Sequence, residues 1–120
     1  MSAARGRAAE DAALRFLEAR GFALLARNYR CRLGEIDLVM RDGESLVFVE
    51  VRARRSPSHG GAAASIGHAK RRRLVAAARH FLMTHPGAAS MPARFDVVAL
   101  SDPGEDAAPR YLRQAFDGTD

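Results

Sequence analysis

Two short apolar runs decide the fold of this chain: GEIDLV at residues 34–39 and VFVEVR at residues 47–52. Asp42-Gly43 stands between them, a dipeptide typical of tight turns that join antiparallel strands. The pattern therefore predicts a β-hairpin with strands over about 34–41 and 46–54. The strands must lie side by side, which brings the charged residues of both runs together.

The register of this hairpin decides which charges meet. If the turn centres on Gly43-Glu44, Asp37 lies opposite Glu50 and Glu35 lies opposite Arg52. A turn centred on Asp42-Gly43 still keeps all four charges on one face, because side chains alternate with a period of two residues. The other face is the one we expect to be buried, and it carries Ile36, Leu38, Val47, Val49 and Val51.

The facing carboxylates have two interpretations. Like charges opposite each other across a strand pair are destabilising unless a positive charge lies between them. Mg²⁺ (or Mn²⁺) would supply that charge at Asp37 and Glu50, because such hard cations prefer oxygen ligands and are commonly held by one or two carboxylates. Alternatively, Glu35 and Arg52 form a surface ion pair while the two acids are simply hydrated on the open face of a sheet. Spacing alone leaves both interpretations open.

Periodicity and turn residues predict the other elements. The sequence indicates a helix over about 3–20, ended by Gly21, and a strand over about 22–30. After a loop at 56–64 comes a helix over about 65–84 with Ser65 as its N-cap. A strand over 94–100, a polar loop over 101–108 and a short edge strand over 110–116 complete the chain. This order predicts an α/β fold of αβββαβ type in a single domain, residues 1–120.

Two charged residues fall among the apolar positions of the predicted helices. Glu10 lies within the apolar arc of the first helix, either at the rim of the core or directed toward a site. Lys70 lies in the apolar stripe of the second helix and is the only lysine among 19 basic residues. A compact ammonium group required at this point is one explanation. A lysine whose aliphatic stem extends the core is the other.

Composition indicates the class of partner. The chain has 120 residues, 48% of them hydrophobic, and a formal net charge of +5, which favours polyanions and above all nucleic acid. The candidate phosphate-binding residues are clustered: Arg54, Arg55, Arg71, Arg72 and Arg73. A single cysteine, Cys31, excludes an internal disulfide. Without an apolar run long enough for a membrane span or a signal peptide, we expect no membrane partner and a cytoplasmic location.

These motifs together resemble the YraN-type family of bacterial proteins. The similarity runs in order over about residues 6 to 100. It is carried by Gly6 and Glu10, Asn28-Tyr29-Arg30, residues 34–39, residues 47–52, Gly60 to Ile66, Lys70 and Arg94 to Val98. The resemblance implies a restriction-endonuclease-like fold, with a mixed central sheet flanked by helices and a distant relationship to archaeal Holliday junction resolvases. It also implies a PD-(D/E)xK nuclease site.

Carried over by position, the resemblance assigns roles to residues of this chain. Asp37 matches the aspartate of the motif and Glu50 its second acid, and both are expected to hold Mg²⁺. Glu10 matches the acidic residue of the first helix that often completes the metal site. Relatives that cut junctions do so as symmetric dimers, so a homodimer is a further expectation.

The chain departs from the motif at two positions. Ile36 replaces the motif proline, a common change, whereas Arg52 stands at the position of the motif lysine. An arginine binds phosphate well but does not readily give up or deliver a proton. We therefore hypothesise that Lys70 reaches Asp37 and Glu50 and does the work of the motif lysine. Arg52 or Glu35 would then adjust the contact to phosphate.

Three functions remain open on sequence alone. The first is a metal-dependent nuclease that hydrolyses phosphodiester bonds of DNA, including branched or junction DNA. The second is a catalytically inactive nucleic-acid-binding module that keeps the nuclease fold and uses its arginines on phosphates. The third is a protein-interaction role, in which the acids of the hairpin form only a hydrated surface. Glu10, Asp37 and Glu50 together favour the first, and Arg52 favours the second.

Overall fold

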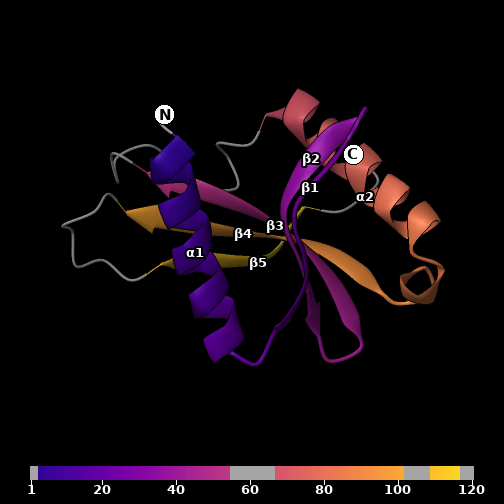
Figure 1. Cartoon of the computed structure of the whole chain (residues 1–120), viewed down its shortest axis with the longest axis horizontal. Coiled ribbons are helices and arrows are strands. Elements are labelled where there is room, and N and C mark those ends of the chain that lie inside the picture. The colour runs from indigo at the N-terminus through magenta and orange to yellow at the C-terminus, as the bar shows by residue number, and fades with distance from the viewer. Residues whose placement is uncertain (1–2, 55–66, 102–108, 117–120) are drawn as a thin grey trace.

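A computed structural model describes residues 3–54, 67–101 and 109–116, and shows one five-stranded sheet with a helix on each face (Figure 1). The order of elements confirms the expected α/β fold with a mixed sheet flanked by helices. They are α1 (Ala3–Ala19), β1 (Ala23–Cys31), β2 (Gly34–Asp42), β3 (Ser45–Arg54), α2 (His68–Thr84), the 3-10 turn η2 (Pro86–Ala88), β4 (Ala93–Ser101) and β5 (Arg110–Phe116).

The strands lie in the sheet in chain order, β1-β2-β3-β4-β5. β3 and β4 are parallel, and the other three neighbouring pairs are antiparallel. A parallel pair needs a crossover connection, and α2 lies within this one, between β3 and β4 in the chain. After α2 the chain re-enters the sheet as β4, which lies directly beside β3 of the predicted hairpin.

The β2–β3 hairpin has the register of a turn at Gly43-Glu44. Leu38 pairs with Val49 and Asp42 pairs with Ser45, while Gly43 takes a positive φ of 61°, which suits the first residue of a two-residue hairpin turn. The ladder ends at Leu38 and Val49, so the expected pairing of Glu35 with Arg52 is wrong. Glu35 is instead the ladder partner of Arg30 in β1.

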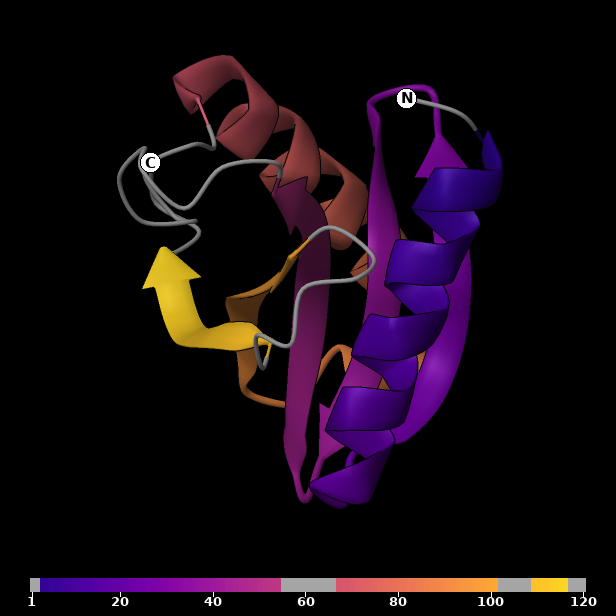
Figure 2. The ribbon, with the colours of Figure 1, turned by 90° about the vertical axis from the view of Figure 1, so that its left-hand side faces the viewer.

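Figure 2 shows α1 and α2 on opposite sides of the sheet. The core accordingly has two layers, one on each face. Leu38, Val47 and Val49 are buried under α1, as expected, and Val51 packs against them. Ile36 is instead buried on the other face under α2, contrary to the prediction.

The opposite face is not the open one that a hydrated interpretation of the acids requires, because Val39 and Phe48 are buried there under α2. Asp37 and Glu50 lie next to these apolar residues, two positions from Val39 along β2 and from Phe48 along β3.

The helix boundaries differ slightly from the prediction. α2 begins at His68, and Gly67 occupies the N-cap position without a side-chain hydrogen bond. The predicted cap, Ser65, lies outside the described residues. Within the part of the chain that the structure describes, neither helix is long and apolar enough to span a membrane.

Both edge strands contain a residue in the left-handed region of backbone conformation. Asn28 of β1 has a φ of 53° and Gln114 of β5 a φ of 52°. Such values are uncommon for residues other than glycine. Each edge of the sheet is therefore locally distorted rather than evenly extended.

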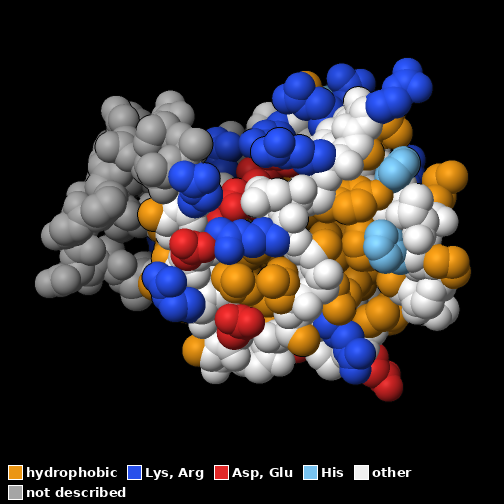
Figure 3. Space-filling model, viewed as in Figure 1, with side chains coloured by type: hydrophobic (Ala, Val, Ile, Leu, Met, Phe, Trp, Pro, Cys, Tyr) orange, Lys and Arg blue, Asp and Glu red, His pale blue; other side chains and the backbone are white. Residues whose placement is uncertain are grey.

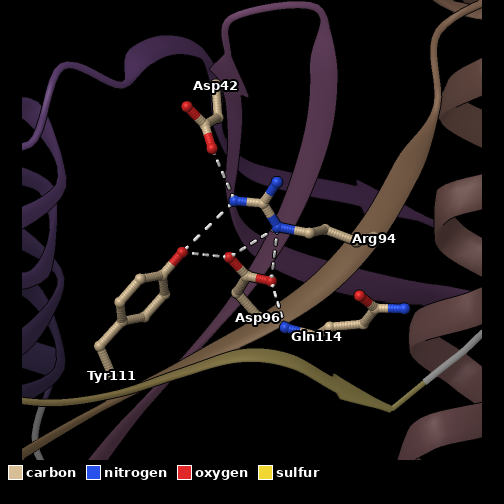
Figure 4. Close-up of polar contacts among 5 residues, drawn as sticks. All are labelled: Asp42, Arg94, Asp96, Tyr111 and Gln114. Atoms are coloured by element: carbon tan, nitrogen blue, oxygen red, sulfur yellow. Dashed lines mark hydrogen bonds and ion pairs between the residues drawn. The ribbon is translucent and has the colours of Figure 1, made fainter.

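A network of buried charges joins the β2–β3 turn to β4 and β5 (Figure 4). Arg94 donates from Nε to both oxygens of Asp96, at 3.1 and 3.2 Å, and from Nη2 to Asp42 at 2.9 Å. Asp96, with no exposed surface, also accepts hydrogen bonds from the hydroxyl of Tyr111 and the amide of Gln114. Each buried charge here has a partner of opposite sign.

Candidate active site

The predicted site residues line one cavity of about 400 Å³ between α1, the ends of β2 and β3, and the start of α2. Glu10 comes from α1, Asp37 from β2, Glu50 from β3 and Lys70 from α2. Glu35 and Arg52 belong to the same wall. Two helices and one hairpin therefore bring all six candidate catalytic and metal-binding residues into one space.

Asp37 sits at the point where the hairpin ladder ends. Its Oδ2 accepts a hydrogen bond of 2.8 Å from the amide of Val51, which takes the place of a strand-to-strand bond. Burial raises the pKa of the Asp37 carboxyl from 3.8 to about 7, and the nearby charge of Glu50 adds to the rise. A hydrogen bond with Glu50 and the charge of Glu10 raise this pKa further. Asp37 is thus a carboxyl group for which the surrounding residues supply too little positive charge.

Glu50 and Lys70 form an ion pair across the cavity. Lys70 Nζ lies 3.1 Å from Glu50 Oε1, and the side chain of Glu50 is only 6% exposed against 39% for Lys70. The lysine reaches the acid because α2 starts beside the end of β3, with Lys70 in its first turn. Its ammonium group lies at Glu50, one of the two acids that the hypothesis about Lys70 names, and Lys70 lines the same cavity as Asp37.

Glu10 is less well compensated. Its Oε1 is buried and has no hydrogen-bond partner among the described residues. The guanidinium of Arg27 in β1 lies 3.5 Å from it and also contacts Asp11. A buried carboxylate oxygen without a hydrogen bond is unfavourable, so this side chain can accept a further donor or cation.

The donor set fits a hard divalent cation in its charge and chemistry. Asp37 and Glu50 supply two carboxylates close enough to hydrogen-bond, and Mg²⁺ is commonly held by one or two carboxylates, with waters and substrate phosphates as its other ligands. Across the described ranges, no three Asp, Glu, His or Cys side chains converge into a ready-made metal site. The fit therefore rests on the Asp37–Glu50 pair, with Glu10 in the wall.

The matches to known proteins cover this whole site. A model of the uncharacterised protein family UPF0102 matches residues 9–100. The chain belongs to the UPF0102 family. The matched span includes Glu10, Asp37, Glu50 and Lys70, and it confirms the resemblance to the YraN-type family that the sequence motifs indicated.

Similar UPF0102 proteins occur in several bacteria. One from Ralstonia nicotianae is 57% identical over 96% of this chain and 88% of its own length. One from Nitrosococcus oceani is 53% identical over 93% of this chain and 90% of its own length. A third, from Xanthomonas oryzae pv. oryzae, is 52% identical over 97% of this chain and 93% of its own length.

The predicted phosphate-binding arginines of this UPF0102 chain are distributed unevenly around the site. Arg73 lines a second cavity beside the acids, and Arg72 is exposed on the same helix. Arg71 is half-buried, with its guanidinium 5.3 Å from the ring centre of Phe116. Arg55 lies outside the described residues, as does the side chain of Arg54.

Sequence reasoning missed three arginines near the site. Arg27 lies beside Glu10, and Arg30 and Arg32 line the second cavity. The register of β1 against β2 brings Arg30 opposite Glu35, and the two form an ion pair of 2.9 Å. The motif Asn28-Tyr29-Arg30 indicates that β1 belongs to the site. The sequence alone does not show which residues of β2 pair with it.

Proposed function

We propose that this protein is a metal-dependent nuclease that hydrolyses phosphodiester bonds of DNA. The observation that carries the proposal is the cavity shared by Glu10, Asp37, Glu50 and Lys70. Its acids are held close together, and burial, followed by the nearby charge of Glu50, raises the pKa of Asp37 to about 7. Perturbed carboxyls that converge in a cleft are typical of catalytic sites rather than of hydrated surfaces.

Asp37 and Glu50 would hold the cation, and Glu10 would add negative charge from the opposite wall. When bound, Mg²⁺ or Mn²⁺ supplies charge stabilisation of the phosphate and a water of lowered pKa. The charge of the bound cation would also offset the repulsion between the two acids, which is unfavourable without it. A phosphate-binding surface would gain nothing from such acids.

Lys70 is the proposed counterpart of the motif lysine. Its Nζ lies 3.1 Å from Glu50 Oε1, so it is within reach of a water or a phosphate oxygen at the acids. An ammonium group there can donate a hydrogen bond to the attacking water or to the leaving oxygen. Arg52, in the same wall, would contact a non-bridging phosphate oxygen and remain protonated throughout.

The substrate and setting follow from the same argument. A basic chain of net charge +5 favours a polyanion, and we propose DNA in the cytoplasm. Preference for branched or junction DNA, and a symmetric homodimer that would cut both strands of a junction, are parts of this proposal that rest on analogy with the resolvases. Light scattering with and without junction DNA would test the dimer.

The decisive experiment is cleavage of labelled single-stranded, duplex, flapped and four-way-junction DNA with Mg²⁺ or Mn²⁺. The native chain is compared with Glu50→Gln, which removes one charge at the acids with little change of shape. Glu44→Gln is the matched control, because Glu44 is exposed at the hairpin turn, outside the lining of the cavity. Metal-dependent cutting that Glu50→Gln abolishes and Glu44→Gln preserves would support the nuclease.

A second candidate is the nucleic-acid-binding module without activity, and Arg52 at the motif-lysine position is the observation that favours it. This function predicts DNA binding that weakens with salt and survives loss of both carboxylates. If the native chain binds DNA in this way but does not cut it, the binding module is supported and the nuclease is not. Neither binding nor cutting, and no affinity for Mn²⁺, would contradict both candidates and favour a role in protein interaction.

A further inference from the structure

A second cavity, of about 370 Å³, lies on the other side of the acids. It is formed by the β1–β2 turn and the first turns of α2. Asp37, Glu50 and Lys70 belong to the linings of both cavities. The two spaces therefore meet at the proposed reaction centre, and a strand that passes over the acids has room on both sides of it.

Most charges of this second cavity are separated in space, because its arginines are exposed and two of its acids, Asp37 and Glu50, are more buried. The exposed Glu35 is the exception, since it is paired with Arg30. Its carboxylates include the buried Glu50, 6% exposed, on the wall shared with the first cavity. Arg30, 72% exposed, lies with Arg32 and Arg73 at the opening toward solvent. Figure 3 shows Lys and Arg side chains surrounding acidic ones at the upper edge of the molecule, where Figure 1 places the tips of β1 and β2 and the start of α2. Such an arrangement suits a cation at the floor and an anion at the rim.

Close packing fixes part of this rim. A Cβ added to Gly34 would lie 2.4 Å from the carbonyl oxygen of Arg73, so only glycine lets β2 approach α2 this closely. Arg73 is thereby held next to the strand that carries Asp37. On the opposite side, Arg30 forms a largely exposed ion pair of 2.9 Å with Glu35.

The lining indicates which part of a nucleotide would bind. Among the described residues that line this cavity there is no Phe, Tyr, Trp or His, so it offers no ring on which a base could stack. Arginines instead bind phosphate through charge-assisted and bidentate hydrogen bonds. Contacts of this kind position a strand without reading its sequence.

We propose that Arg30, Arg32 and Arg73 form a flanking-phosphate subsite, which binds the phosphate next to the one that is cleaved. The inference rests on the proposed nuclease function for its position in the reaction, but it concerns binding. It predicts that affinity depends on one phosphate beside the scissile one and not on the base attached to it. It also predicts that cleavage shows little preference for sequence.

The test measures binding of short labelled single strands by fluorescence anisotropy at several salt concentrations. All proteins carry Glu50→Gln so that no strand is cut. Arg32→Gln and Arg73→Gln should each lower the slope of log affinity against log salt, and the double variant should lower it by about 0.7, the value for one phosphate contact on a single strand. A set of strands with one neutral methylphosphonate linkage at each position in turn should show one position that weakens binding to the parent and not to Arg73→Gln.

Arg79→Gln is the matched control, because Arg79 is exposed on the same helix but lines neither cavity. If Arg32→Gln and Arg73→Gln behave like this control, the subsite is wrong, whether or not the native chain cuts DNA. If they change the salt slope while the native chain cuts nothing, the subsite stands and the nuclease fails. Urea unfolding of each variant confirms that only binding has changed.

Discussion

Two clusters of buried charge lie at opposite ends of the β2–β3 hairpin and differ in how fully their charges are compensated. At the turn end, Asp96 is fully buried yet accepts hydrogen bonds from Arg94, Tyr111 and Gln114. At the open end, Asp37 has the amide of Val51 on one side and the carboxyl of Glu50 on the other. The same residue type is satisfied in one cluster and left short of positive charge in the other.

The difference is the one expected between a structural cluster and the ligand-binding cluster that we propose. A fully paired buried cluster fixes the arrangement of strands, and removing one member leaves the rest without partners. An under-compensated cluster lowers the stability of the folded protein, because burial and repulsion both disfavour its charges. Retaining it makes sense when a ligand supplies the missing charge. The comparison therefore predicts opposite effects for like substitutions in the two clusters.

The largest effect is expected for Asp96→Asn. This change removes the charge that compensates Arg94, which is only 9% exposed, and should lower the free energy of unfolding by about 3–5 kcal/mol. Urea unfolding monitored by circular dichroism measures it. A loss below about 1 kcal/mol would show that Asp42 alone compensates the arginine, and would remove the contrast between the clusters.

The same substitution in the other cluster, Asp37→Asn, should stabilise the protein. The pKa of Asp37 is about 7 in the folded chain against 3.8 ordinarily, so folding disfavours its charged form. Stability from this group is full below pH 4, falls between pH 4 and 7 as the unfolded chain ionises first, and stays low above pH 7. A pKa of about 7 against 3.8 corresponds to about 4 kcal/mol, and at pH 8 the variant should gain up to that amount. A loss of stability at pH 8 would contradict the assignment of Asp37 as an under-compensated acid.

The affinity for divalent cations should depend on pH, because Asp37 is a proposed ligand. A cation must displace the proton from Asp37, so affinity for Mn²⁺ should fall by up to about tenfold per pH unit below 7 and level off above it. Calorimetric titration between pH 5.5 and 8 measures this. Asp37→Asn should bind weakly at every pH, whereas a variant of the other cluster, Tyr111→Phe, should bind like the native chain. An affinity for Mn²⁺ that does not change with pH would contradict the proposal that Asp37 is a metal ligand.

Gly34→Ala should disturb the acid cavity and leave the Arg94 cluster intact. The added Cβ would lie 2.4 Å from the carbonyl oxygen of Arg73, so α2 must move and take Lys70 with it. We expect a loss of about 1–2 kcal/mol in unfolding free energy and weaker binding of Mn²⁺. Gly87→Ala is the control, since nothing lies within 4 Å of its added Cβ. Equal behaviour of the two variants would contradict the close approach.

The smallest effect is expected for Glu35→Gln. Its ion pair with Arg30 is largely exposed, at 47% and 72%, so stability should change by less than about 1 kcal/mol. DNA binding should tighten slightly, because the change removes a negative charge beside the proposed subsite. Anisotropy at low salt measures this. Weaker binding would mean that Glu35 is needed to hold Arg30 in place.

Much of the fold could be predicted because local signals agree with one another. Alternation in residues 34–39 and 47–52, with a glycine at the turn, predicts both strands and leaves two registers, of which the structure has the one that pairs Leu38 with Val49. The end of the ladder could not be predicted, because it depends on the Asp37 side chain taking the amide of Val51. The start of α2 was also missed, since Gly67 supplies no side-chain cap that a pattern could reveal.

The site was predictable where one residue broke a pattern. Glu10 and Lys70 are charges at apolar helix positions, and both line the cavity of Asp37 and Glu50. Arg27, Arg30 and Arg32 broke no pattern, because charges alternate along many exposed strands, and only the pairing of β1 with β2 brings them to the acids. The Arg94 network likewise requires Tyr111 from β5, whose place in the sheet follows from tertiary packing.

The left-handed residues of the two edge strands affect whether another copy of the protein can pair with the edges of the sheet. An exposed, evenly extended edge presents unpaired amide and carbonyl groups on which another chain can add a strand. Asn28 and Gln114 break that row in β1 and β5, and Asp96 captures the amide of Gln114 from within. Either edge would have to be reshaped before two sheets could join along it. The sheet thus carries its own protection against edge-to-edge aggregation at both margins.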